Sequence, residues 1–100
     1  MDEAQMKYQQ SILRNFFDAE ERLKSIPGQK KKKLVVLEHL AAGLDPHKKY
    51  TEKELNEYIK QYHEDFCTLR REFIVHGFMD REDSVYHVHT GESRTRWQDL

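Results

Sequence analysis

Residues 50–89 read YTEKELNEYIKQYHEDFCTLRREFIVHGFMDREDSVYHVH. This stretch contains signals for two helix starts, one helix end and one turn in close succession. Residues 51–54 form a capping box, in which the hydroxyl of Thr51 accepts from the amide of Glu54 and the Glu54 carboxylate accepts from the amide of Thr51. Apolar residues follow at helical spacing, namely Leu55, Tyr58, Ile59 and Tyr62. The sequence therefore predicts a helix with one apolar face after Thr51.

A second helix is predicted after Asp65, because Asp is a favoured N-cap residue. Its buried face consists of Phe66, Leu69 and Phe73, and Gly77 suits the left-handed residue that follows a helix C-terminus. Residues 78–81 and 85–89 are then predicted as the two strands of a β-hairpin, joined by residues 82–84.

Two apolar patterns precede this stretch. Residues 4–17 predict an amphipathic helix, whose apolar face either covers the domain's own core or forms a dimer seam. Residues 22–26 alternate between polar and apolar before Pro27-Gly28, which predicts a short strand, although residues 19–24 also fit an extension of the first helix. From Gln29 the helical pattern returns, and Gly43 and Pro46 mark its end.

This order of elements predicts an α+β fold of winged-helix type, with a three-helix helix-turn-helix core, a C-terminal β-hairpin wing and an extra N-terminal helix. We divide the chain into an N-terminal helix (1–18), a winged-helix-like domain (19–90) and a C-terminal tail (91–100). The tail is either loosely ordered or pinned by Trp97, its only large aromatic residue. The predicted core contains the apolar stripes of three helices: Leu34, Leu37, Leu40, Leu55, Ile59, Phe66, Leu69 and Phe73.

The chain as a whole is highly charged but nearly neutral, with 35% charged residues and a formal net charge of −1. Domains that bind nucleic acid are usually strongly basic, so only a local basic patch would support that role. Cys67 is the single cysteine, which excludes an intrachain disulfide. The longest apolar run, residues 34–37, is far shorter than a membrane span of about 20 residues, and we expect a cytoplasmic protein without a membrane partner.

Several short motifs run through the chain in a fixed order: Arg22-Leu23-Lys24-Ser25-Ile26-Pro27, the basic run into Leu34-Val35-Val36-Leu37, Tyr50-Thr51-Glu52-Lys53-Glu54-Leu55-Asn56, Asp65, Leu69-Arg70-Arg71-Glu72, Gly77 and Asp80-Arg81. Over about residues 20–88 this series resembles an uncharacterised bacterial family, domain of unknown function 2087. Its members resemble small stand-alone proteins or segments of helix-turn-helix regulators, which implies a transcription-related role. The family has no established active site, so the resemblance assigns no functional residue.

The basic run of Lys30, Lys31, Lys32 and Lys33 stands at a predicted helix start, where the helix dipole disfavours each cation by a few tenths of a kcal/mol. A helix N-terminus with lysines is suited to phosphate binding. The alternative is a solvated, solubilising face, which is what charge runs usually form. Lys48 and Lys49 add two more cations before the capping box.

The helix after Asp65 is the candidate recognition helix, and Thr68 and Arg71 lie opposite its buried face, where they can contact phosphates or base edges. Arg70 lies on the flank of the buried stripe, within reach of a carboxylate on a neighbouring element or of Asp65. Carboxylates at both ends of this surface oppose duplex binding, namely Glu64 and Asp65 at the helix start and Asp80, Glu82 and Asp83 in the predicted wing.

Two functions therefore stay open. The first is a winged-helix DNA-binding or accessory module of bacterial transcription regulation, with double-stranded DNA as the partner. The second is a protein-interaction module that keeps the fold without binding DNA, and its partner is another regulator or a second copy bound through the N-terminal helix. If the six lysines and Arg71 share one face, DNA binding is favoured, whereas carboxylates among them favour protein interaction.

Histidines and the lone thiol provide only partial chemical sites. His87 and His89 share one face of a strand, and His63 and Cys67 are four residues apart, but neither pair supplies the four ligands of a structural zinc site. The His63–Cys67 pair also lacks an orienting third group. We expect no enzyme activity, no bound metal and no cofactor.

The capping box gives a direct test of the helix after Thr51. Thr51→Ala is expected to lower the free energy of unfolding by about 0.5–2 kcal/mol, because the cap hydrogen bond is lost. Thr51→Ser keeps the hydroxyl oxygen and is expected to be nearly neutral. Urea denaturation of both variants measures the difference, and equal losses would contradict a capping role for Thr51.

Overall fold

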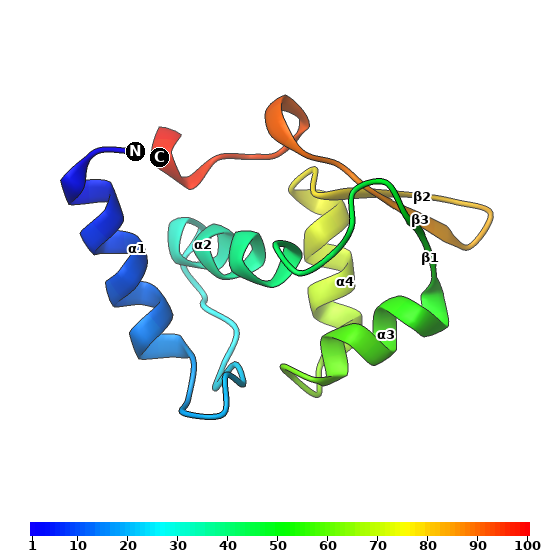
Figure 1. Ribbon diagram of the computed structural model, residues 1–100, viewed down its shortest axis with the longest axis horizontal. Helices are drawn as coiled ribbons and strands as arrows, with labels where there is room; N and C mark the ends of the chain where they lie inside the picture. The colour runs from blue at the N-terminus through cyan, green and yellow to red at the C-terminus, as the bar shows by residue number, and fades with distance from the viewer.

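The computed structural model describes residues 1–100 and contains four α-helices and one three-stranded antiparallel sheet (Figure 1). The predicted α+β class with a C-terminal hairpin is confirmed. None of the helices has the length and apolar character needed to cross a membrane. The elements in chain order are α1 (Glu3–Phe16), α2 (Lys30–Ala41), β1 (Lys49–Thr51), α3 (Glu52–Lys60), α4 (Phe66–Val75), β2 (Met79–Glu82), β3 (Val85–Val88) and the short 3₁₀ helices η1 (Gly91–Ser93) and η2 (Trp97–Asp99).

Both predicted helix starts are present as capped N-termini. At α3, the Glu54 amide donates to Thr51 Oγ1 over 3.1 Å, and the Thr51 amide donates to Glu54 Oε1 over 3.0 Å. At α4, the Thr68 amide donates to Asp65 Oδ1 over 3.2 Å. These side chains satisfy amides that have no partner within the helix, and they fix where each helix begins.

The end of α4 is a Schellman motif built around Gly77, as predicted. Gly77 has a φ of 77°, its amide donates to the Ile74 carbonyl over 3.2 Å, and the Phe78 amide donates to the Phe73 carbonyl over 2.8 Å. The rings of Phe73 and Phe78 lie 5.9 Å apart, which supplies the apolar contact that accompanies this motif. The chain therefore leaves α4 in one fixed direction and enters β2.

The sheet has the strand order β1-β3-β2 and differs from the prediction in two places. Strand β1 is absent from the prediction, because its three residues are too few to show the alternation of a strand. It pairs Tyr50 with Tyr86 of β3. Residues 83 and 84 alone form the hairpin turn, both with positive φ, so Glu82 belongs to β2 and not to the loop.

The predicted strand over residues 22–26 is wrong, because this segment makes only a single bridge, between Phe17 and Leu23. The Leu23 amide donates instead to the Tyr62 carbonyl just beyond α3, over 2.8 Å. The Arg22 guanidinium also donates to the carbonyls of Lys60 and Gln61. The segment thus covers the C-terminal end of α3, and its alternation reflects burial of Leu23 against the core.

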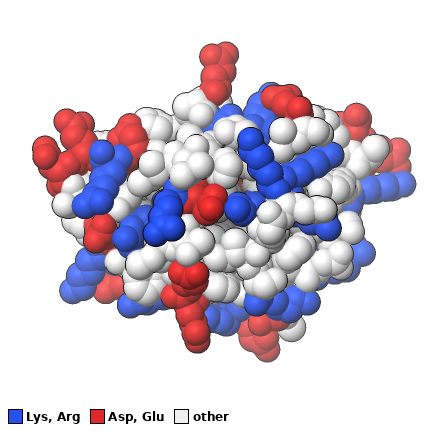
Figure 2. Space-filling model, turned by 180° about the vertical axis from the view of Figure 1, so that it is seen from behind, with Lys and Arg blue, Asp and Glu red and all other residues white.

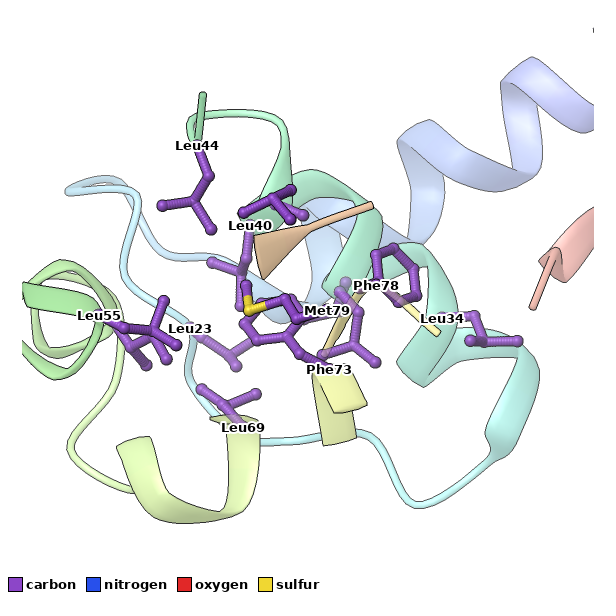
Figure 3. Packing of buried hydrophobic residues seen from close by; sticks show 14 of the residues in the cluster. Leu23, Leu34, Leu40, Leu44, Leu55, Leu69, Phe73, Phe78 and Met79 are labelled. Atoms are coloured by element: carbon purple, nitrogen blue, oxygen red, sulfur yellow. The ribbon is translucent and has the colours of Figure 1, made fainter. Parts of the chain in front are cut away.

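The core lies between the helices and the inner face of the sheet, and 19 buried residues form one cluster. Figure 3 draws part of this cluster. Every predicted core residue belongs to it or packs against it, and all except Phe66 are buried. Phe66 is partly exposed, and the Lys60 ammonium lies 4.7 Å from its ring centre. The core prediction is therefore confirmed with one residue at the edge.

Helix α1 and the C-terminal segment both fold back over α2, and the two chain ends lie side by side (Figure 1). Ile12 of α1 is buried, so α1 covers the domain's own core. Trp97 is 1% exposed and its ring lies 5.7 Å from that of Tyr8. The prediction that Trp97 holds the C-terminal tail against the domain is therefore confirmed.

The contact between α4 and the tail predicts different effects for two glycines that both have positive φ. A Cβ at Gly77 would lie 1.9 Å from the Ser93 carbonyl oxygen, whereas one at Gly91 would meet nothing within 4 Å. Each alanine variant is expected to lose about 1–2 kcal/mol from the left-handed backbone, and Gly77→Ala is expected to lose more because the tail must move. Urea denaturation followed by Trp97 fluorescence measures this, and equal losses would contradict the close approach of Ser93.

Candidate nucleic-acid interface

A groove of about 300 Å³ runs between α4 and the β2–β3 hairpin. Its lining contains three arginines and no carboxylate; the residues are Cys67, Arg70, Arg71, Ile74, Arg81 and Tyr86. Helix α4 buries Leu69 and Phe73 on its inner side and thereby presents Cys67 and Arg71 to solvent on the outer side. Positive charge from two different elements therefore converges on one surface.

Glu52, the first residue of α3, holds two of these arginines. Its Oε1 lies 3.7 Å from Arg70 Nη2 and 3.9 Å from Arg81 Nη2, and it accepts a hydrogen bond from the Tyr86 hydroxyl over 2.9 Å. Arg70 also donates to Asn56 Oδ1, which confirms that it binds a neighbouring element. Burial and the bond to Glu52 raise the pKa of Tyr86, so this hydroxyl stays a donor. One carboxylate for three arginines leaves the groove with excess positive charge.

The predicted lysines do not share one face. In the run at the start of α2, Lys31 Nζ lies 4.6 Å from the ring centre of Tyr8 on α1, and Lys33 Nζ lies 3.4 Å from Glu72 Oε1 on α4. The other two lysines of the run differ in exposure: Lys30 is exposed, and Lys32 is partly exposed. The run is thus divided between two neighbouring helices.

Carboxylates also lie among the remaining predicted cations. Lys48 Nζ is 3.7 Å from Glu54 Oε2, and Lys49 is exposed on β1 opposite His87. On the face shown in Figure 2, acidic and basic side chains alternate, and no single sign covers it. For the lysines, this is the distribution that favours protein interaction over DNA binding.

Of the eight predicted contact residues only Arg71 lines the groove. Thr68 is partly buried, and its hydrogen bonds to the Asp65 carboxylate lower the pKa of that group, so its role is in the cap. The sequence predicts a carboxylate partner for Arg70 and assigns no role to Arg81. The helical projection could place Arg70 beside Arg71, but no sequence pattern places Arg81 there, since that depends on how the hairpin crosses α4.

The outer face of the hairpin carries a separate cluster around Asp80. His87 Nδ1 lies 2.9 Å from Asp80 Oδ1, and His89 Nε2 lies 2.5 Å from Asp80 Oδ2. The two histidines thus share a face, as predicted, and both turn to one carboxylate. Their hydrogen bonds lower the pKa of Asp80. No three or more His, Cys, Asp or Glu side chains are arranged to hold a metal ion.

Comparison with known proteins gives one match. The model of a family described as "Uncharacterized protein conserved in bacteria (DUF2087)" matches residues 22–88, which extend from just before Leu23 to the end of β3. The matched span includes every residue of the arginine groove and excludes α1 and the C-terminal segment. No curated protein and no solved structure matches the chain.

The Asp80 cluster predicts a pH-dependent contribution to stability. Because the folded pKa of Asp80 lies below the unfolded value of about 3.9, its contribution is fully present above that value and is lost as the pH falls through the folded pKa. Asp80→Asn is therefore expected to be less stable than the parent at about pH 6, and the difference should shrink below about pH 4. Urea denaturation at a series of pH values measures it, with Glu57→Gln, an exposed α3 variant, as control. A difference that stays constant down to about pH 2 would contradict the assignment.

Proposed function

This chain belongs to the DUF2087 family of uncharacterized bacterial proteins, and we propose that it is a winged-helix module of transcription regulation that binds duplex DNA weakly through the groove between α4 and the hairpin. The element order α2-β1-α3-α4-β2-β3 and the strand order β1-β3-β2 support the winged-helix assignment. In that assignment α3 and α4 are the helix-turn-helix pair, α4 is the recognition helix and the β2–β3 hairpin is the wing.

The three arginines of the groove are the observation that carries this proposal. Guanidinium groups bind phosphate oxygens through paired hydrogen bonds, and a rigid arrangement of them reduces the entropy lost on binding. Glu52 and Tyr86 hold Arg70 and Arg81, while Arg71 is exposed and pairs with no carboxylate. The groove therefore combines two oriented cations with one that is free to reach a phosphate.

The proposed footprint is small. Lys33 and Lys48 pair with Glu72 and Glu54, and the other lysines lie away from the groove. Glu52 offsets one of the three arginines, so about two phosphates are neutralised. The acidic residues Glu82 and Asp83 at the hairpin tip reduce the attraction further. The domain is thus proposed to bind weakly alone and to add to a stronger contact made by another regulator.

The second candidate is a protein-interaction module, and the apolar residues of α4 favour it. Ile74 and Val75 are 39% and 64% exposed, directly beside Arg71. Apolar side chains beside arginines suit a partner segment that carries both carboxylates and apolar residues. A second copy of this chain, bound through α1, belongs to the same candidate class, since Met6 of α1 is 46% exposed.

Duplex binding measured against salt tests the first proposal. Fluorescence anisotropy with a labelled duplex is expected to show binding at low salt, with a slope of log K against log salt of about −1.8 for two phosphates. Arg71→Gln is expected to weaken binding and to reduce the slope by about one unit, with stability changed by less than about 0.5 kcal/mol. Arg14→Gln, an exposed charge on α1, is the matched control and is expected to behave as the parent does. Failure of the parent to bind duplex at low salt would reject the proposal and favour the protein-interaction module.

A further inference from the structure

The C-terminal segment crosses α2 (Figure 1). A second cavity, of about 310 Å³, lies between them. All of its lining residues are polar or glycine, and apart from Glu38 of α2 they come from residues 91–98. Residues 91–98 lie beyond the span that the family model matches, whereas Glu38 lies within it. The cavity shares no lining residue with the arginine groove, so its ligand is inferred separately.

The wall of this cavity is fixed by contacts on both sides. Trp97 is buried against α1 and α2, and the Thr95 amide donates to the His76 carbonyl at the end of α4 over 2.8 Å. Ser93 lies against Gly77, where there is no room for a side chain. A ligand would therefore meet a formed surface and would not have to order a loose tail.

Arg94 carries a charge that the protein only partly satisfies. Its Nε donates to the His89 carbonyl over 2.7 Å, and its guanidinium lies 4.7 Å from the ring centre of Phe78. No protein group accepts from its two terminal nitrogens, and burial lowers the pKa of Arg94. Partly buried charges are normally paired, and two neighbouring guanidinium N–H groups match the two oxygens of a carboxylate or phosphate.

Two further residues refine the chemistry of the ligand. Arg96 supplies a second cation at the cavity, and its one ion pair, with Asp99, is 3.9 Å long and exposed. Gln98 also lines the cavity, and its Oε1 is buried without a hydrogen-bond partner. A buried carbonyl oxygen without a donor costs free energy, so a ligand that donates an N–H or O–H to it gains from filling this position.

Two carboxylates oppose an anion here, those of Glu38 and Glu92, and Glu92 is exposed to solvent. Glu38 lines the cavity, and its Oε1 accepts from Gln9 Nε2 of α1 over 3.3 Å. It is therefore held in place by α1 and lowers the affinity for anions without closing the cavity. We infer that this cavity binds a small molecule with an oxyanion, either a carboxylate or a phosphate, together with a hydrogen-bond donor. Arg94 and Arg96 bind the oxyanion, and Gln98 accepts from the donor.

Matched probes distinguish the sources of the oxyanion and test the donor. Hydrogen phosphate and sulfate are alike in shape, but only hydrogen phosphate has an O–H donor. Glycine and acetate both have a carboxylate, but only glycine has an amino group as donor. Trp97, the single tryptophan, stands in the chain between the lining residues Arg96 and Gln98, so its fluorescence is used to report binding. In a buffer without phosphate or carboxylate, we expect saturable binding of hydrogen phosphate or of glycine, several-fold tighter than its matched probe. Which of the two binds identifies the class, and equal affinity within both pairs would overturn the donor requirement.

Three variants separate binding at this cavity from other effects. Arg96→Gln changes an exposed side chain and should still fold, and it is expected to weaken probe binding about tenfold, as for loss of a charged hydrogen bond. Glu38→Gln removes one of the two opposing charges at constant size and is expected to strengthen binding. Arg71→Gln, in the other groove, is expected to leave probe affinity unchanged. The test of this cavity is therefore independent of the test of duplex binding. Absence of saturable binding by all four probes, or probe affinity that neither Arg96→Gln nor Glu38→Gln alters, would overturn the inference.

Discussion

The structure depends on the need to cover α2 on all sides. Four consecutive residues, Leu34 to Leu37, are fully buried, which is more than one side of a helix can bury against a single partner. Helices α1 and α4 and the C-terminal 3₁₀ turn all contact α2. Exposure of these four side chains would cost roughly 1.5–3 kcal/mol each, so α1 and Trp97 are held in place by the same burial that holds α4. Both proposed sites lie where these coverings meet other elements.

Glu52 plays the corresponding polar role on the opposite side of the molecule. It begins α3, where a carboxylate is stabilised by the helix dipole, and its Oε1 meets Arg70 of α4 as well as Arg81 and Tyr86 of the hairpin. The two ion pairs are partly exposed, and each alone is worth little, whereas the hydrogen bond comes from the buried Tyr86. Together they set the position of the hairpin relative to α4, which determines whether the arginines share a groove.

Local signals predicted α3 and α4 well because their determinants lie within a few residues of each helix end, as at Thr51, Asp65 and Gly77. Features that depend on distant partners were missed. Strand β1 exists because Tyr50 meets Tyr86, and residues 22–26 are not a strand because Leu23 bonds beyond the end of α3. The lysine run was judged as one unit, but α1 and α4 divide it by providing Tyr8 and Glu72 as separate partners. Of the three arginines of the groove, helical periodicity could place Arg71 and Arg70 side by side, but it could not place Arg81 there.

The nearly neutral charge of the chain constrains how either site can work. With a formal net charge of −1, the domain has no long-range field that draws an anion toward it. Charges beyond about 8–10 Å are screened at physiological ionic strength, so only the arginines in direct contact with a bound group contribute. Weak, short-range binding of this kind becomes effective when a second contact raises the local concentration of the partner. The charge distribution therefore agrees with the proposed accessory role better than with a domain that finds its target alone.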